Sequence, residues 1–150
     1  MRVVVQRSFG AKVRVDDDIV AEFDGLGLVL LVGISADDSA KDLEYMVDKV
    51  LHLRVFPDEE GKMNQDVLQV GGDVLSISQF TLYGDVRKGR RPNYMRAAPP
   101  DVARPLYDAF NDGLRALCPR VHTGRFGAMM QVSFTNDGPV TILLDSERSF

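Results

Sequence analysis

An uninterrupted apolar segment of strand length constrains the fold of this chain more than any other feature. Residues 28–34 are all Leu, Val or Ile apart from Gly33. The run is too short for a membrane span, which needs roughly 18 or more apolar residues. Its length and β-branched content instead indicate a strand that is buried on both faces of a sheet.

Several other segments show the alternation or the β-branched content of strands. They are residues 1–7, 11–15, 19–23, 74–82, 128–134 and 140–144. Short polar segments follow residues 11–15 and residues 128–134, and their Asp, Asn, Gly and Pro residues are typical of hairpin turns. We therefore expect two hairpins in the sheet.

Two segments carry apolar residues at helical spacing, and each stripe covers one side of a helix. The first follows Asp37, Asp38 and Ser39, which favour a helix start, and its stripe is Leu43, Met46, Val47, Val50 and Leu51. The second opens at Pro99-Pro100-Asp101, and its stripe is Val102, Leu106, Ala109, Phe110, Leu114 and Leu117. We predict one α+β domain over residues 1–150, with a mostly antiparallel sheet or small barrel and two amphipathic helices packed against it.

The sequence lacks the residue patterns of disulfides, metal sites and nucleotide-binding loops. The only cysteine is Cys118, which excludes an internal disulfide, and His52 and His122 are too far apart for a recognisable metal motif. No glycine-rich phosphate loop occurs, so we expect no metal and no cofactor. The first eight residues lack the apolar core of a signal peptide, and we expect a cytoplasmic protein without a membrane segment.

Positive charge is concentrated in one segment, although the formal net charge of the chain is −4. Five basic residues lie within ten positions: Arg87, Lys88, Arg90, Arg91 and Arg96. A run of this kind is often no more than a solvated loop. The alternative is weak, salt-sensitive contact with the phosphates of a nucleic acid.

The last strand before this basic segment is rich in hydroxyl groups. Alternation places Ser78, Phe80 and Leu82 on one face, and Gln79 and Thr81 on the other. One interpretation is a half-buried strand whose hydroxyls bond to neighbouring backbone. The other is a pocket wall whose backbone N–H groups bind a carbonyl oxygen. A threonine nucleophile would need an activating base, and neither histidine is near Thr81 in the sequence.

Two glycine-containing segments lie further along the chain. Residues 136–141 contain Gly138-Pro139 and have the composition of a turn. A cis bond there would make a stiff projection of backbone carbonyls, but only about 5–6% of X–Pro bonds are cis, so the sequence does not predict one. Residues 123–130 place Phe126 between two glycines, which is typical of a strand entry with a core phenylalanine.

Together these segments resemble the D-aminoacyl-tRNA deacylase family along essentially the whole chain. The similarity rests on stretches in the family's order: residues 1–7 (MRVVVQR), 78–82 (SQFTL), 87–89 (RKG), 91–92 (RP), 97–100 (AAPP), 123–127 (TGRFG) and 136–141 (NDGPVT). Residues 8–10 and 133–134 depart from the family's pattern, but no role is assigned to any of them.

The resemblance implies an editing hydrolase that cleaves the ester of D-aminoacyl-tRNA, and of glycine mischarged on tRNA(Ala), while excluding L-aminoacyl-tRNA. It implies a homodimer in which a cis Gly138-Pro139, supported by Arg7, reaches into the partner's pocket. The pocket floor would be Ser78, Gln79, Phe80 and Thr81, and its wall would be Phe126 and Met130. Catalysis would be assisted by the 2′-hydroxyl of the terminal ribose of the tRNA. On this interpretation the 3′ end of the tRNA would be contacted by Arg87, Lys88, Arg90 and Arg91.

Two other functions stay open on the residues alone. One is a threonine-dependent esterase or amidase that acts on small D-aminoacyl compounds. The other is a dimeric interaction protein without catalytic activity, in which the Gly138-Pro139 turn is only structural.

Overall fold

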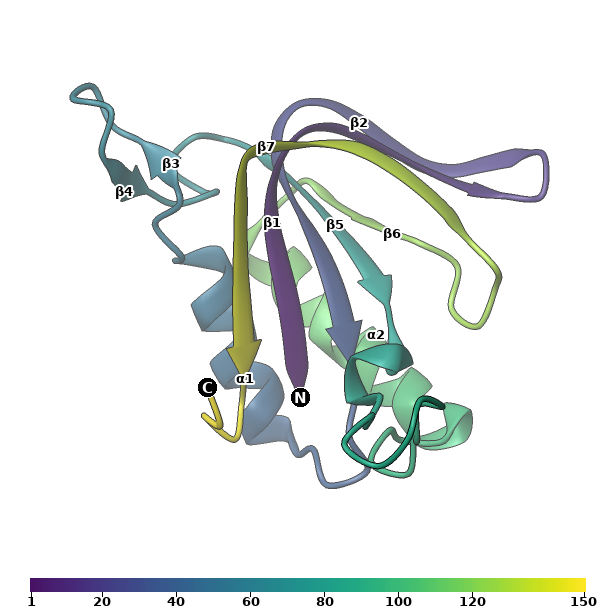
Figure 1. Cartoon of the computed structure of the whole chain (residues 1–150). Coiled ribbons are helices and arrows are strands. Elements are labelled where there is room, and N and C mark those ends of the chain that lie inside the picture. The colour runs from purple at the N-terminus through teal and green to yellow at the C-terminus, as the bar shows by residue number, and fades with distance from the viewer.

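The computed structural model describes residues 1–150, which form a five-stranded sheet, a two-stranded ribbon and two helices (Figure 1). The strands are β1 (Arg2–Val15), β2 (Asp18–Gly33), β3 (Phe56–Pro57), β4 (Met63–Gln65), β5 (Asp73–Ser78), β6 (Val121–Thr123) and β7 (Gln131–Asp145). The helical elements are α1 (Ala40–Leu51), the short 3₁₀ turn η1 (Phe80–Tyr83) and α2 (Pro100–Leu117). The predicted α+β class is confirmed.

The five-stranded sheet is open, and the expectation of a small barrel is wrong. Its strand order is β6-β5-β2-β1-β7, so β6 and β7 form its two edges. β1 pairs antiparallel with β2 and β7, whereas β5 pairs parallel with β2 and β6. The sheet is therefore mixed. Its parallel half arises because α1 and α2 each carry the chain back to the starting end of the sheet between neighbouring strands.

The three long strands each join segments that the sequence pattern separates. β1 and β2 continue through the positions between their apolar runs. β7 continues through residues 136–141, and both of its halves pair with β1: Phe134 lies opposite Ala11, and Thr141 lies opposite Gln6. The predicted hairpin between residues 128–134 and 140–144 is therefore wrong. The turn-like composition corresponds to a register shift within one strand.

The apolar segment 28–34 lies in the middle of the sheet, and both of its faces are buried as predicted. Leu28, Leu30 and Val32 belong to the main core on the side of the helices. Val29 belongs to a smaller core on the opposite side, with Leu75, Ile77 and residues from the outer halves of β1 and β2: Ala11, Val13 and Phe23. Figure 1 shows these outer halves extending over β5 and β6.

Both predicted helices are confirmed, and they lie together against one side of the sheet (Figure 1). Ser39 and Asp42 form a capping box at the start of α1. All five apolar residues predicted for α1 are buried. In α2 the buried side is rotated relative to the prediction, because Val102 and Leu117 are exposed whereas Ala103 and Tyr107 are buried. Neither helix combines the length and the hydropathy that a membrane crossing requires.

Gly27 allows the outer and inner parts of β2 to pack closely. A Cβ atom at this position would lie 2.6 Å from the Asp73 carbonyl oxygen and 2.6 Å from the Phe23 ring. Because one neighbour is backbone and the other is a buried ring, neither can move away easily. We predict that Gly27→Ala lowers the free energy of unfolding by about 1–3 kcal/mol, the usual cost of overpacking.

Urea denaturation measures this loss. The control Asp24→Ala, at an exposed position of the same strand, should change stability by less than about 0.5 kcal/mol. Equal unfolding midpoints for the two variants would contradict the packing described for Gly27.

Candidate active site

The segment that follows β5 leaves the sheet one residue after the strand ends. The Gln79 N–H donates to the Val32 carbonyl at 2.7 Å, and the chain then turns into η1, where the Leu82 N–H donates to the Gln79 carbonyl at 3.3 Å. The predicted strand over residues 74–82 is therefore too long. The alternation of faces expected for Phe80, Thr81 and Leu82 does not occur.

Gly33 at the end of β2 makes room for this turn. A Cβ atom on Gly33 would lie 3.1 Å from Cβ of Leu82 and 3.2 Å from the Gln79 carbonyl oxygen. Tyr107 of α2 anchors β5, because its hydroxyl donates a hydrogen bond to the Ser76 carbonyl at 2.8 Å. The position of η1 is thus fixed by backbone contacts with β2 and by an anchored β5.

Two neighbouring cavities open around Phe80 and share Ser78, Phe80 and Gly127. The first, of about 430 Å³, is mainly apolar, and its other lining residues are Val32, Ile34, Tyr94, Ala97, Ala98, Pro99, Pro100, Ala103 and Phe126. The second, of about 490 Å³, is lined in addition by Ile77, Gln79, Thr81, Ala128, Met129, Met130 and Val132. Phe80 is 56% exposed and packs edge-to-face on Tyr94, with ring centroids 5.0 Å apart.

The two cavities contain polar groups but no side chain that is charged or basic at neutral pH. Neither is lined by a histidine, lysine, arginine, aspartate or glutamate. The Thr81 hydroxyl oxygen accepts a hydrogen bond from the Gln79 amide, which is not a base. The first backbone bond inside η1 is donated by Leu82, so the N–H groups of Phe80 and Thr81 have no acceptor within the turn. The wall of the second cavity therefore offers backbone donors.

The predicted wall residues come from the segment between β6 and β7. The Gly124 N–H donates to the Ser76 carbonyl at 3.0 Å and holds this segment beside β5. Phe126 lines the first cavity, and Met130 lines the second. The two side chains thus lie on the same side of the site, but in neighbouring cavities. Phe126 is not a buried core residue, although its ring packs 5.8 Å from the Tyr107 ring.

Gly138-Pro139 has a cis peptide bond and lies within β7 beside Arg7. The Arg7 guanidinium forms a 2.9 Å ion pair with Asp137 and donates to the Val55 carbonyl at 2.7 Å. Arg7 therefore links this segment to the chain that leads into β3. This contact is consistent with the role that the resemblance implies for Arg7, which is to support Gly138-Pro139.

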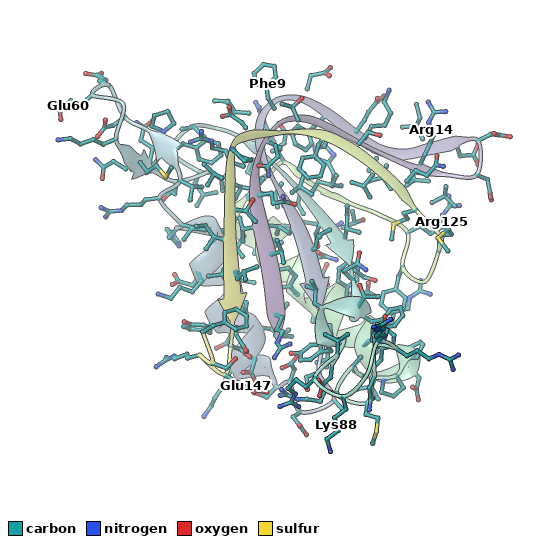
Figure 2. All side chains as sticks on the ribbon, viewed as in Figure 1. Phe9, Arg14, Glu60, Lys88, Arg125 and Glu147 are labelled. Atoms are coloured by element: carbon teal, nitrogen blue, oxygen red, sulfur yellow. The ribbon has the colours of Figure 1, made fainter.

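The same chain does not bring Gly138-Pro139 to the cavities. Gly138-Pro139 lies on β7 beside Arg7 of β1. Arg7 pairs with Leu28 of β2, and Leu28 pairs with Val74 of β5, so Gly138-Pro139 is three strands away from β5. Val74 is four residues before Ser78, so the two sites are also displaced along the strands. At roughly 4.8 Å per strand and 3.3 Å per residue, this is about 20 Å. In Figure 2, Phe9, two residues after Arg7 in β1, lies at the top of the molecule, and Lys88, in the loop after η1, lies at the bottom.

The basic segment forms an exposed loop next to η1. Arg87 forms a 2.6 Å ion pair with Asp85, and hydrogen bonding from Arg87 lowers the pKa of Asp85 to about 2. Lys88, Arg90 and Arg91 are exposed and form no ion pair. Their charges therefore face solvent close to the cavities.

The remaining candidates of the sequence lie outside the site. Cys118 is buried in the main core. His122 contacts Asp73 at 2.8 Å, whereas His52, directly after α1, contacts Asp48 at 3.2 Å. No three His, Cys, Asp or Glu side chains come together in a group that could hold a metal ion.

Sequence reasoning missed one wall of the first cavity. Tyr94, Ala97, Ala98 and Pro99 come together there because the Ala98 N–H donates to the Ile34 carbonyl at 2.9 Å, which brings the start of α2 against the end of β2. The sequence feature that could have indicated this wall is the run of small and rigid residues at 97–100, directly at the start of a helix. Nothing in its spacing indicates that it faces the turn after β5.

Comparison with known proteins identifies the family. The D-Tyr-tRNA(Tyr) deacylase family matches residues 4–145. The chain belongs to this family. A D-aminoacyl-tRNA deacylase of Geobacillus sp. (strain WCH70) is 58% identical over 98% of this chain and 96% of that protein. A D-aminoacyl-tRNA deacylase of Thermus aquaticus is 59% identical over 97% of this chain and 95% of that protein.

A solved structure supports the same fold. The c-Myc DNA unwinding element binding protein superposes with a TM-score of 0.92 at 42% identity, over 97% of this chain and 98% of that one. The resemblance to the deacylase family is therefore confirmed over nearly the whole chain. Every segment that lines the two cavities falls inside residues 4–145, the range that the D-Tyr-tRNA(Tyr) deacylase family matches.

Proposed function

We propose that this chain hydrolyses the ester that joins a D-amino acid or glycine to the 3′ end of tRNA and leaves L-aminoacyl-tRNA intact. The observation that carries the proposal is the pair of cavities around Phe80, whose walls offer the backbone N–H groups of Phe80 and Thr81 and no side chain that is charged or basic at neutral pH. Membership of the D-Tyr-tRNA(Tyr) deacylase family supports this reaction class. A cytoplasmic location is part of the proposal, because protein synthesis uses aminoacyl-tRNA there.

The two cavities suit the two parts of an aminoacylated adenosine. The first cavity is apolar and carries the rings of Phe80, Tyr94 and Phe126, so it suits the terminal adenine, which binds well against aromatic side chains. The second cavity, over Gln79 and Thr81, would take the ester and the amino acid. The ribose would then lie across Phe80, which belongs to both cavities.

Hydrolysis in this site needs no side-chain base, because the substrate contributes to catalysis. When water adds to the ester carbonyl, negative charge develops on the carbonyl oxygen, and the N–H groups of Phe80 and Thr81 would donate hydrogen bonds to it. The free 2′-hydroxyl of the terminal ribose lies beside the same ester and would assist the attacking water. Collapse of the adduct then releases the amino acid and the 3′-hydroxyl of the tRNA. Positioning of this kind lowers the barrier without a titrating residue.

We assign chiral selectivity to the Gly138-Pro139 segment of a second copy of the chain. The segment lies roughly 20 Å from the cavities of its own chain, so it would enter the pocket of a neighbour. Its backbone carbonyls beside the substrate Cα would leave room for a hydrogen or a D side chain and would overlap an L side chain. Glycine passes for the same reason, and glycine mischarged on tRNA(Ala) is therefore a substrate in this proposal.

Exposed apolar residues around the cavities are consistent with a homodimer. Met129 is 90% exposed, and Phe80 is 56% exposed. Both residues line the second cavity. Large exposed apolar side chains that lie together are typical of a surface that a partner covers.

The exposed basic loop is the proposed contact for the tRNA backbone. Lys88, Arg90 and Arg91 have no carboxylate partner, while Arg87 is fixed by Asp85. Contacts to phosphates carry no sequence information. A loop of this kind therefore suits an enzyme that accepts many tRNAs and releases each of them after hydrolysis.

A deacylation assay tests the proposal directly. Purified protein should release amino acid from D-tyrosyl-tRNA and glycyl-tRNA(Ala), and it should leave L-tyrosyl-tRNA at the rate of spontaneous hydrolysis. Intact D-tyrosyl-tRNA after incubation would favour an interaction protein without catalytic activity. Equal cleavage of the D and L esters would contradict selection by exclusion.

The role of Thr81 separates RNA-assisted hydrolysis from a threonine nucleophile. We predict that Thr81→Ala keeps kcat within about tenfold of wild type, because the backbone N–H remains, whereas loss of a nucleophile costs far more. D-tyrosyl-tRNA that ends in 2′-deoxyadenosine should react about 10²–10⁴ times more slowly, the usual contribution of a group that assists proton transfer.

Single-turnover kinetics measure both effects, and circular dichroism checks that the variant is folded. An inactive but folded Thr81→Ala protein would contradict the mechanism. Rapid cleavage of small D-aminoacyl esters without RNA, lost in this variant, would favour the threonine-dependent esterase or amidase.

The proposed selectivity segment depends on its support by Arg7. Removing the Asp137 carboxylate breaks a partly exposed ion pair, which costs only about 0–1 kcal/mol of stability. Steric selection, in contrast, requires positions held within about 0.5 Å. We therefore predict that Asp137→Ala lowers the ratio of kcat/KM for D- over L-tyrosyl-tRNA by about tenfold, with little change in Tm.

The control Asp17→Ala, at the exposed tip of the β1–β2 hairpin, should keep the wild-type ratio. Sedimentation equilibrium should give twice the chain mass of 16.6 kDa. A selective enzyme that sediments as a monomer would exclude a segment donated by a second copy.

A further inference from the structure

A third cavity lies beside the end of η1 and shares no lining residue with the two cavities of the candidate active site. Its volume is about 340 Å³, and its lining is predominantly polar, with Arg2, Tyr83, Asp85, Arg87 and Arg96 among its residues. These residues come from three distant parts of the chain: the start of β1, the end of η1 and the basic loop. The fold thus gathers three guanidinium groups around one opening.

Each guanidinium is held in place but keeps unused donors. Arg87 uses Nε and Nη2 for Asp85, and Arg96 uses Nη2 for Glu147. Arg2 uses Nη1 for the Leu82 carbonyl, at 3.0 Å, and its Cζ lies 4.7 Å from the centroid of the Tyr83 ring. Because an arginine has five N–H donors in a rigid plane, all three retain N–H groups for a further acceptor.

Two buried donors beside this cavity make no hydrogen bond. They are the Arg2 Nε atom and the hydroxyl of Tyr83, which is only 3% exposed. Arg2 Nε forms an ion pair with Asp145 at 3.6 Å, which is longer than a hydrogen bond. Burial, together with the nearby carboxylates of Asp38 and Asp145, raises the pKa of Tyr83. The hydroxyl therefore keeps its proton and stays a donor.

The carboxylates do not prevent an anion from binding. Asp85, which itself lines the cavity, and Glu147 pair with Arg87 and Arg96 and leave the other N–H groups of each guanidinium free. Lys88, Arg90 and Arg91, which have no ion-pair partner, follow in the same loop. The loop outside the cavity therefore carries three unpaired positive charges, and the guanidinium groups that line the cavity can donate to a tetrahedral oxyanion.

We propose that this cavity binds one backbone phosphate of the single-stranded 3′ end of the tRNA. This inference rests on the proposed function and names the part of the substrate that the chain holds. Phe80 and Tyr83 lie at the two ends of one 3₁₀ turn, roughly 6 Å apart. A phosphate beside Tyr83 would then belong to the last three nucleotides, and the paired acceptor stem would lie further out.

The cavity and the loop have different tasks under this proposal. Lys88, Arg90 and Arg91 attract the tRNA through unfixed, solvated charges, whose effect is lost at high salt. The cavity sets the register of the 3′ end relative to Phe80 through directed hydrogen bonds. Arg2 connects the two sites, because the guanidinium that would face the phosphate also holds the Leu82 carbonyl of η1.

Binding of short ligands tests the inference without requiring hydrolysis. The ligands are the trinucleotide CCA without an attached amino acid, which carries backbone phosphates, and adenosine, which carries none. We expect Arg96→Gln to weaken CCA binding about tenfold, as the loss of one charge-assisted hydrogen bond predicts, and to leave adenosine binding unchanged. Tyr83→Phe, which removes only the buried hydroxyl, should weaken CCA binding by a smaller factor in the same direction.

Arg115→Gln is the matched control, because Arg115 is a partly exposed, ion-paired arginine of α2. It should change neither affinity. Equal weakening of both ligands by Arg96→Gln would show that Arg96 acts on the shape of the adenosine site, and would overturn the inference. Unchanged CCA affinity in both Arg96→Gln and Tyr83→Phe would also overturn it.

Kinetics distinguish a failure of this inference from a failure of the proposed function. With D-tyrosyl-tRNA, Arg96→Gln should raise KM about tenfold and leave kcat unchanged, whereas D-tyrosyl-adenosine should be hydrolysed as by wild type. If wild-type protein cleaves neither ester, the proposed function fails, and the CCA affinities still decide whether the cavity takes a phosphate. If KM rises with tRNA but CCA binding is unchanged, the phosphate lies beyond the last three nucleotides and the inference is wrong.

Discussion

The hydrogen bond from Gln79 to the Val32 carbonyl is the contact on which the rest of the site depends. It is the last rung between β2 and β5, and it ends the sheet at one defined residue. Gly33 follows Val32 directly, and its missing Cβ lets the chain after Gln79 fold back against the strand end. A larger residue at Gly33 would push η1 away from the sheet, and both cavities are built around that turn.

This origin explains why the site is made of backbone and small polar groups. A turn packed against the end of a buried strand exposes N–H groups that neither the sheet nor a helix uses. Burying a charged side chain beside them would carry a desolvation cost, and none lines the two cavities. The proposed reaction suits such a wall, since the ribose hydroxyl of the substrate takes the place of a protein base. The protein then has to hold the 3′ end in register, which is the task proposed for the cavity beside Tyr83.

The sequence predicted the buried strand at residues 28–34 and the two helices, because each has a local pattern. It did not predict where strands end or which strands pair. Residues 80–82 continue the alternation of β5, but the backbone bond at Gln79 ends the strand, and alternation does not report that bond. Gly138-Pro139 has the composition of a turn, yet pairing of both flanks with β1 keeps it within β7. The wall at Tyr94 depends on a contact between Ala98 and Ile34, which are 64 positions apart in the sequence.

β1 connects the two functional ends of the molecule. Arg2 near its start holds the carbonyl of Leu82 in η1, and Arg7 holds Asp137 beside Gly138-Pro139. Five residues of strand separate these arginines by roughly 17 Å, and the central position of β1 between β2 and β7 makes that separation rigid. A chain built in this way cannot fold the proposed selectivity segment into its own pocket. Under the proposed function, the segment would therefore act in a second copy of the chain, and chiral selection would require a dimer.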